Sequence, residues 1–276
     1  MLDIGGDSDK SESIDQLRDL WASVSSYPVY QSEEAMLHFL NTMCKILGAH
    51  SGTWLAMKKL KSNPRRVAAD DYAVILEQLG GWAPVAAVYT SKSKNLNGVM
   101  NRWLMHARKE GVDPLSQTVL DNFGKSRVHI SAELDPELNW ADSWLPKKYF
   151  SYYGIGDRMM GLYYLTDDCE SCLVFDRPAD SEAFSAVEKN VLYLAMTGST
   201  ELHKRLLMEH GVIRATTPLS KRERETYRLL LTEMSESQIA DKMKLSMHTV
   251  HDYARGLYKK FQVKGRVGLM ALVLGH

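Results

Sequence analysis

Apolar positions recur every three or four residues in four short stretches between residue 218 and the C-terminus. This spacing is typical of amphipathic helices, which bury one stripe of side chains. The first three stretches begin at Ser220, Ser235 and Ser246, and serine is a favoured residue at a helix N-cap. Glu223, three residues after Ser220, completes a capping box. The pattern predicts four helices, over about residues 220–231, 235–243, 246–261 and 265–274.

Residues 244–246 form a short turn between the second and third predicted helices. Ala240 is small where these two helices must cross. The arrangement is that of a helix-turn-helix, whose second helix enters the major groove of DNA. In the third predicted helix the apolar stripe is buried, which leaves the opposite face available to DNA. That face carries His251, Asp252, Arg255 and Lys259.

Charge is divided unevenly along the chain. Residues 218–276 hold eleven lysines and arginines against six acidic residues, a net charge of +5, whereas the first 217 residues carry −5. A basic segment attached to an acidic one is typical of a nucleic-acid-binding module joined to another domain. The sequence therefore predicts double-stranded DNA as a partner.

Three stretches of this segment follow a familiar order: LSKRERE from Leu219, SQIADKMKLSMHTV from Ser237 and LYKKFQVKGR from Leu257. With them the segment resembles the DNA-binding domain of the LuxR-type (GerE/NarL-type) transcriptional regulators. The resemblance implies that the third helix reads DNA and that the fourth packs two copies together on a two-fold site.

Site residues follow from the resemblance position by position. Phosphate contacts are implied for Ser246, Thr249 and Lys259, and base-facing positions for His251, Asp252 and Arg255. Arg255 is the strongest candidate for a base contact, because a guanidinium pairs bidentately with guanine. Candidates for dimer contacts are Leu269, Met270 and Val273, with the core of the small domain as the alternative.

The segment departs from the family pattern at the turns. Glu233 and Lys244 stand where family members usually have glycine. A lysine in a left-handed turn costs about 1 kcal/mol, which a folded domain tolerates. Asp252 brings a carboxylate close to the phosphates, which is unfavourable unless it accepts a hydrogen bond from a cytosine amine or pairs with Arg255.

The first 208 residues mix both periodicities. Apolar residues at helical spacing predict helices, and short alternating or continuous apolar runs predict strands. Helices are expected over 14–25, 32–48, 71–79, 94–109, 115–123, 144–152 and 185–208, and strands over 52–57, 82–89, 127–130, 157–164 and 169–175. The last two strands flank a turn at residues 166–168.

This order predicts an α+β domain with an antiparallel sheet and flanking helices, followed by an all-α four-helix domain. Short motifs such as GGWAPV, YYGIGDRM and VFDRP make the front part resemble GAF/PAS-type sensory domains, as in planctomycete-like bacterial members of this regulator class. The expected ranges are a disordered lead-in over 1–12, a sensory domain over 13–208, a linker over 209–217 and the DNA-binding domain over 218–276.

Two familiar sensor types fit poorly. The front half lacks the alternating α/β pattern of a phosphorylated receiver domain. Binders of acyl-homoserine lactones carry two tryptophans, a tyrosine and an aspartate at spacings that this chain does not match cleanly. If a ligand pocket exists, its candidate residues are Trp54, Trp82, Trp103, His129, Asp157 and Tyr163, with a place in the domain core as the alternative.

Composition adds several exclusions. No apolar run approaches the roughly 18 residues that a membrane span needs, and the polar N-terminus is no signal peptide, so we expect a cytoplasmic protein without a membrane partner. Cys169 and Cys172 form a CxxC, but zinc needs four ligands and no second pair is nearby. We expect packing cysteines and no metal or cofactor. No HExxH, GxSxG, P-loop or GxGxxG motif indicates an enzyme.

The sequence thus predicts a sequence-specific DNA-binding transcriptional regulator. In this hypothesis it is a one-component switch and a homodimer, whose N-terminal domain senses a small-molecule or protein effector and sets the dimer geometry. The alternative is a protein-interaction module whose helical adaptor tail does not read DNA.

Overall fold

A five-stranded antiparallel sheet forms the centre of the N-terminal part of the chain. Its strands are β1 (Ser51–Lys59), β2 (Trp82–Tyr89), β3 (Arg127–Ile130), β4 (Ile155–Thr166) and β5 (Cys169–Pro178). The order across the sheet is β2-β1-β5-β4-β3, and every neighbouring pair is antiparallel. The predicted α+β layout with an antiparallel sheet is confirmed, including the hairpin of β4 and β5.

The computed structural model describes residues 7–60, 78–90, 96–134 and 136–275. The chain divides into two compact units. One consists of Met1–Ala22 and Leu37–Ser199, and the other of Ser23–Met36 and Thr200–His276. The predicted basic loop after Pro64 and nearly all of the helix expected over 71–79 lie outside the described residues.

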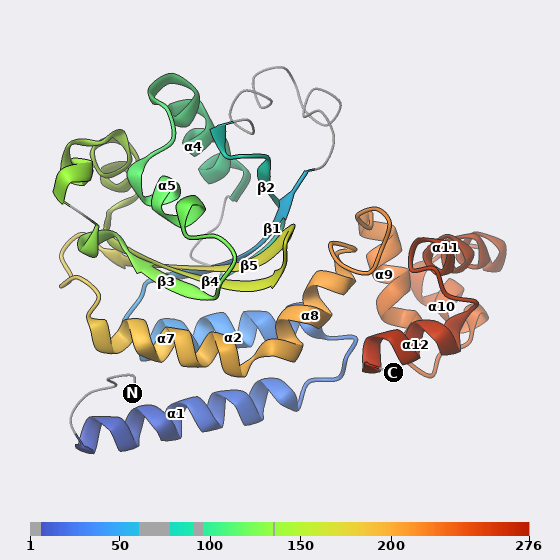
Figure 1. Ribbon diagram of the computed structural model, residues 1–276. Helices are drawn as coiled ribbons and strands as arrows, with labels where there is room; N and C mark the ends of the chain where they lie inside the picture. Colours follow the sequence, from blue (N-terminus) through green and yellow to red (C-terminus); the bar gives the residue numbers. More distant parts are fainter. Residues whose placement is uncertain (1–6, 61–77, 91–95, 135, 276) are drawn as a thin grey trace. The chain divides into compact units, whose positions relative to one another are not determined.

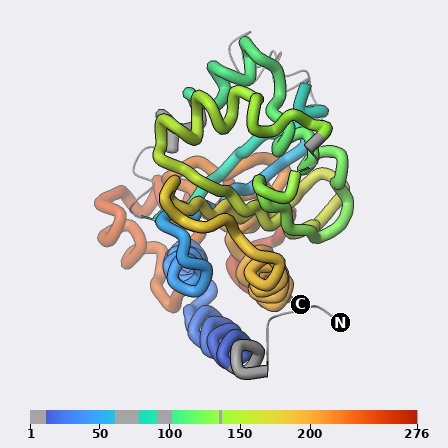
Figure 2. Tube along the Cα trace, turned by 90° about the vertical axis from the view of Figure 1, so that its left-hand side faces the viewer, coloured from blue at the N-terminus to red at the C-terminus, as the bar shows by residue number. Residues whose placement is uncertain are grey.

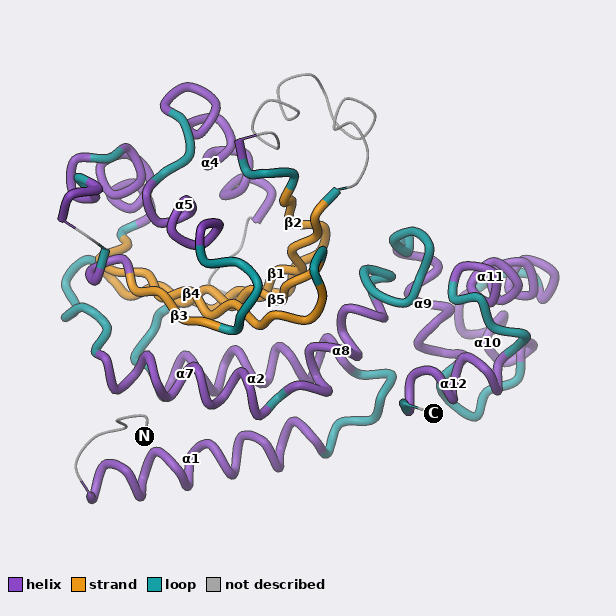
Figure 3. The backbone as a smooth tube through the Cα atoms, in the orientation of Figure 1, coloured by secondary structure: helices purple, strands orange, loops and turns teal. Residues whose placement is uncertain are grey.

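Helices cover both faces of the sheet. On one face lie α4 (Leu96–Glu110) and α5 (Pro114–Asp121), and on the other α2 (Ser32–Ile46) and α7 (Ala186–Gly198), with α1 (Asp7–Ser25) beyond them (Figure 1). An end-on view shows α2 and α7 side by side against the sheet (Figure 2). The strands therefore form the middle layer between two layers of helix (Figure 3).

The connection from β3 to β4 is made of short helical turns. They span Ser131–Glu133, Pro136–Leu138, Trp140–Asp142, Leu145–Phe150 and, as α6, Ser151–Tyr153. The predicted helix over 144–152 therefore appears as one turn of π-helix that runs into α6. Most aromatic residues of this connection pack with residues of α4 and α5 in one hydrophobic cluster, whereas Tyr152 is exposed.

Side chains of the sheet alternate between its two faces, as strand geometry requires. A methyl group at Gly161 would lie 3.2 Å from Leu192 and Met196, which places that side of β4 against α7. A methyl group at Gly52 would lie 3.0 Å from Cys44 of α2 and from Phe175. The positions one residue away in each strand face α4 and α5 instead.

The second unit contains the predicted four-helix domain. Its helices are α8 (Thr200–Glu209), α9 (Lys221–Leu230), α10 (Glu236–Met243), α11 (Met247–Lys260) and α12 (Arg266–Leu274). The last four agree with the predicted helices to within about one turn. Capping boxes are present at Ser220 and at Ser235, and Ser246 caps α11.

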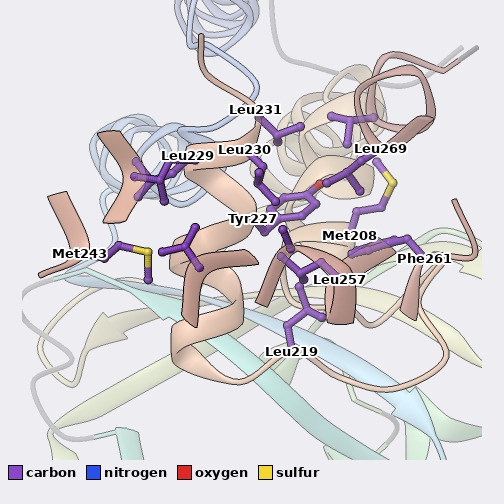
Figure 4. Packing of buried hydrophobic residues seen from close by; sticks show 14 of the residues in the cluster. Met208, Leu219, Tyr227, Leu229, Leu230, Leu231, Met243, Leu257, Phe261 and Leu269 are labelled. Atoms are coloured by element: carbon purple, nitrogen blue, oxygen red, sulfur yellow. The ribbon is translucent and has the colours of Figure 1, made fainter. Parts of the chain in front are cut away.

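Tyr227 occupies the middle of this unit's hydrophobic core (Figure 4). Its ring stacks on Phe261 with 5.5 Å between the ring centroids. Met208 of α8 and Leu219 belong to the same cluster, so the core begins before residue 218. Gly211 has a φ of +67°, and the chain there lies so close to Leu219 that a methyl group would come within 2.8 Å of its backbone nitrogen. The segment expected as a linker is therefore packed against the domain.

In the turn between α10 and α11, Lys244 adopts the left-handed backbone conformation considered from the sequence. Lys244 has φ 54° and ψ 48°, and the next residue, Leu245, donates its backbone N–H to the carbonyl of Ala240 at 3.0 Å. This closes α10 without a glycine. At the other end of the domain, Arg266 donates to the carbonyls of Leu230 at 2.8 Å and Met234 at 2.6 Å, which satisfies backbone groups at and after the end of α9.

The exit helix and the first helix differ from the prediction. The single helix expected over 185–208 is wrong, because it breaks at Ser199 into α7 and α8. Gly198 lies directly against the indole of Trp21, and the Trp21 Nε1–H donates to the Ala195 carbonyl at 3.3 Å. The first helix begins at Asp7, inside the range expected to be a disordered lead-in.

We expect Gly198→Ala to destabilise the protein by roughly 1–3 kcal/mol, because the added methyl group would overlap the Trp21 indole and force it to move. Urea unfolding followed by circular dichroism measures the loss. Gly256→Ala in α11 is the control, since nothing lies within 4 Å of its added methyl group and we expect a gain of about 0.5–1 kcal/mol. Equal stability of the Gly198 variant and the wild type would contradict the packing described.

Candidate functional site

The outward face of α11 carries the residues predicted to contact bases. His251, Asp252 and Arg255 are exposed, whereas Val250 and Ala254 between them are buried. The His251 ring nitrogen lies 3.0 Å from a carboxylate oxygen of Glu236 at the start of α10. Asp252 does not pair with Arg255 but lies 3.5 Å from His248, one turn earlier. Among the described residues no carboxylate is within ion-pair distance of Arg255, so its guanidinium is available.

The residues predicted to contact phosphates lie at the two ends of α11. The Ser246 hydroxyl accepts the Thr249 backbone N–H at 3.0 Å, and the two hydroxyls lie 2.8 Å apart at the start of α11. Lys259 is exposed near the other end of the helix. Basic side chains and a helix N-terminus on one face are what phosphate contacts require.

The predicted dimer residues of α12 divide between two environments. Leu269 and Val273 are buried in the core of their own domain, and Met270 is half-buried against it. The apolar side chains that α12 leaves exposed are instead Val267, 82% exposed, and Leu274, 54% exposed.

A second feature is a cavity of about 550 Å³ between the sheet and the helices α4 and α5. Pockets for small molecules in proteins span about 300–1,000 Å³. Its wall is mostly aromatic and aliphatic, and it takes alternate residues of β1, namely Thr53, Leu55 and Met57. The remaining wall comes from β2, β3, β4, β5, α4, α5 and the helical turns before β4.

Only two of the six residues predicted for a pocket line this cavity. They are Trp82, at the start of β2, and Trp103 of α4. The ring of Trp82 lies 4.5 Å from that of Phe123, another wall residue. The Trp103 indole donates at 3.1 Å to Asp113, the fully buried N-cap of α5, which fixes the position of this wall residue.

The other four predicted residues lie elsewhere. Trp54 is fully buried on the opposite side of β1 and donates to the Ser171 hydroxyl at 2.5 Å. Asp157 accepts the backbone N–H groups of Ala132 at 3.1 Å and Phe184 at 2.8 Å, which ties the ends of two loops together. Tyr163 and His129 are strand residues that do not line the cavity, and burial and the Arg127 charge lower the pKa of His129 to about 4.

Two buried ion pairs lie in the cavity wall. Arg158 donates to both carboxylate oxygens of Asp176, at 2.7 and 3.0 Å. Arg127 donates to both carboxylate oxygens of Glu170, at 2.6 and 3.1 Å. Bidentate pairing compensates both charges, as burial of charge demands, although the buried Arg127 Nε makes no hydrogen bond.

These four wall residues were missing from the predicted pocket. Counting residues outward from the turn at 166–168 would have placed Arg158 opposite Asp176 in the β4–β5 hairpin, as the register confirms. No sequence signal joins Arg127 to Glu170, because they belong to strands that do not neighbour each other. Cys172 also lines the cavity, whereas Cys169 does not, and burial raises the pKa of each thiol to about 12.

With this geometry in view, residues 217–273 match the family model GerE, described as bacterial regulatory proteins, luxR family. The C-terminal segment is a luxR-family domain. The chain therefore carries the DNA-binding helix-turn-helix of a transcriptional regulator, and the exposed residues of α11 lie on its second helix. No curated protein sequence matches the chain.

Solved structures with a similar fold include two of SdiA and one of VqsR. Escherichia coli SdiA is 13% identical with a TM-score of 0.47, covering 95% of this chain and 98% of that one. SdiA in complex with octanoyl-rac-glycerol is 14% identical, with a TM-score of 0.43 and 94% of each chain covered. The VqsR LBD domain from Pseudomonas aeruginosa is 12% identical, with a TM-score of 0.42, 73% of this chain and 98% of that one covered.

A partly buried charge cluster joins the luxR-family domain to the rest of its unit. Arg228 of α9 pairs with two carboxylates, Glu33 at the start of α2 and Glu209 at the end of α8. His210 lies 3.1 Å from Glu33 through Nε2, and its Nδ1 lies 3.2 Å from the Arg224 guanidinium. Since Arg224 can only donate, the neutral His210 carries its proton on Nε2 and donates it to Glu33.

The pKa values of the two glutamates in this cluster are shifted in opposite directions. Burial raises the pKa of Glu33, but hydrogen bonds from His210 and Arg228 outweigh it and lower that pKa to about 2. Burial raises the pKa of Glu209 to about 7, because Arg228 only partly offsets it and the charge of Glu33 adds to it. Two carboxylates that share one guanidinium cannot both be fully compensated, and Glu33 has the additional partner.

The high pKa of Glu209 predicts a pH-dependent stability. Between the ordinary value of 4.5 and about 7 the folded state holds a proton that the unfolded state has lost, so stability falls as pH rises through this window. Glu209→Gln lacks that proton equilibrium. Relative to the wild type, the variant should therefore gain stability between pH 5 and pH 8, by on the order of 2–3 kcal/mol.

Urea unfolding at the two pH values measures this difference. Glu201→Gln on the exposed face of the same helix gives the baseline for removing a glutamate charge from α8. A difference between Glu209→Gln and the wild type that stays constant from pH 5 to pH 8 would contradict the assignment.

Proposed function

We propose that this protein is a one-component transcriptional regulator that binds a small molecule in the cavity of its N-terminal unit and binds DNA as a homodimer. The observation that carries the proposal is the cavity itself. A chain that holds a luxR-family DNA-binding domain also holds, in a separate unit, a largely apolar space of ligand size with a few charged groups.

The DNA-reading assignment rests on the face of α11. Arg255 has no ionic partner among the described residues, and Ser246 and Thr249 present their hydroxyls at the helix start. An arginine on a recognition helix can pair with guanine O6 and N7, while hydroxyls and lysines position the helix on the backbone. We propose that Asp252, paired weakly with His248, accepts a hydrogen bond from a cytosine amine.

The dimer contact that we propose uses α12. Since Leu269 and Val273 serve their own core, the exposed Val267 and Leu274 together with Met270 supply the apolar surface. Two recognition helices related by a two-fold axis would read half-sites about one turn of DNA apart. A ligand could change their spacing through the chain that connects the units, because α7 packs on the sheet and α8 follows it after one residue, Ser199.

Neither a membrane role nor catalysis is proposed. None of the helices in the described part of the chain has the length and apolar character that crossing a membrane requires. The two carboxylates of the cavity wall are each held by both oxygens to an arginine, which removes them as general bases. An adaptor without DNA binding is not favoured, because the helix-turn-helix domain is that of the luxR family.

Arg255→Ala should weaken binding to the preferred DNA site by about 1–3 kcal/mol and relax the sequence preference at one position, because it removes a bidentate base contact. Lys259→Ala should weaken binding to all sequences alike and reduce the slope of affinity against salt concentration by about one. Fluorescence anisotropy with labelled duplexes at several salt concentrations measures both effects.

Lys204→Ala is the matched control for these variants, since it removes one exposed positive charge from α8 in the same unit. It should leave both affinity and salt slope close to those of the wild type. If Arg255→Ala and Lys259→Ala bind DNA like the control, α11 is not the reading helix.

Selection of bound duplexes from a random pool by the full-length protein tests DNA reading and dimerisation together. We expect an enriched motif with two-fold symmetry and half-sites one helical turn apart. Val267→Asp should turn that motif into a single half-site, because a charge on the exposed face of α12 opposes pairing of two copies. An asymmetric motif for the wild type would contradict the proposed homodimer.

A further inference from the structure

The charges in the cavity wall do not balance. Among the residues that the structure describes, the wall contains three arginines, Arg102, Arg127 and Arg158, but only two carboxylates. Arg127 is paired with Glu170, and Arg158 with Asp176. The side chains of these four residues are between 4 and 13% exposed. Each of these pairs is neutral as a whole and has its oxygens occupied, so neither pair offers a free charge to a ligand.

Arg102 of α4 is the remaining cation. Its guanidinium carbon lies 3.7 Å from the centroid of the Tyr152 ring, which holds the group flat. Among the described residues no carboxylate lies within ion-pair distance of Arg102. Glu110, at the end of the same helix, is paired with Lys148, whose ammonium lies 2.6 Å from it. A stacked arginine keeps its donors free at the edge of the plane, where they can meet a planar anion.

Arg102 and Tyr152 stand at the open side of the cavity. Tyr152 is 61% exposed and Arg102 is half-buried, whereas Leu115, Leu145 and Leu162 of the wall are almost fully buried. The wall therefore offers a cation at its rim and an apolar surface inside. A molecule that satisfies both has an apolar body and a negatively charged group at one end.

Building on the proposed small-molecule site, we propose that its ligand is an amphipathic carboxylate: an acyl or aryl acid whose apolar body fills the cavity and whose carboxylate pairs with Arg102. Within the described ranges the wall has one uncompensated positive charge, and a carboxylate supplies one negative charge. A phosphate monoester carries between one and two charges near neutral pH and would leave an excess inside a largely apolar wall. A neutral ligand would leave Arg102 without an anionic partner.

Isothermal titration calorimetry of the full-length protein with four probes of equal chain length tests this inference. The probes are decanoate, decanol, decylamine and decyl phosphate. We expect decanoate to bind roughly ten- to hundredfold more tightly than decanol, as a charge-assisted hydrogen bond predicts, and decylamine to bind most weakly. Arg102→Met should abolish the preference for decanoate and leave the affinity for decanol unchanged. Arg102→Lys should keep part of the preference.

Unchanged decanol binding by Arg102→Met shows that the cavity is intact, and Lys109→Met, an exposed cation on the same helix outside the wall, should behave like the wild type. Equal affinities for decanoate and decanol, or a preference that survives Arg102→Met, would overturn the carboxylate assignment alone. Tighter binding of decyl phosphate would replace the carboxylate by a phosphate. If none of the four probes binds, the small-molecule site itself fails, and this inference fails with it.

Discussion

The alternation of side chains across one five-stranded sheet governs the whole N-terminal unit. Along each strand, one set of residues packs against α2 and α7, and the other set faces α4 and α5, where the cavity lies. Register then decides which side chains meet, because paired residues of neighbouring strands share a face. A shift of one residue in β4 or β5 would move Arg158 and Asp176 out of the cavity wall and bring core residues into it.

This constraint explains what could be predicted from the sequence. The luxR-family domain has local signals: serine caps, a periodic apolar stripe and a three-residue turn, so its helices agree with the structure. The strands of the front unit also have local signals. The cavity does not, because its wall combines residues from strands and helices up to 125 residues apart along the chain, from Ser51 to Asp176. Trp54 and Trp82 are the same residue type, and only their positions in the sheet distinguish them. Trp54 is buried in the core, whereas Trp82 lines the cavity.

The break between α7 and α8 and the ion pairs between distant segments were also hard to predict, because they depend on contacts between residues far apart along the chain. Within residues 185–208, Gly198 and Ser199 are local signals for the end of a helix, but the periodic apolar pattern continues past them. The space beside Gly198 is occupied by Trp21, which lies far away along the chain. Similarly, Arg127 and Arg228 each find their carboxylates on other segments. In both units, buried arginines hold together elements that local sequence patterns leave unconnected.

The composition of the second unit has a consequence for how the chain folds. Residues 23–36 belong with residues 200–276, and Glu33 supplies one of the two carboxylates that Arg228 binds. During synthesis residues 23–36 emerge early, but α9, which carries Arg228, is made only after about 190 further residues have been added. The ion pair between Glu33 and Arg228 therefore forms late. Closing so long a loop costs little more entropy than closing one of half the length, yet the DNA-binding unit cannot be completed before residues 200–276 have been made.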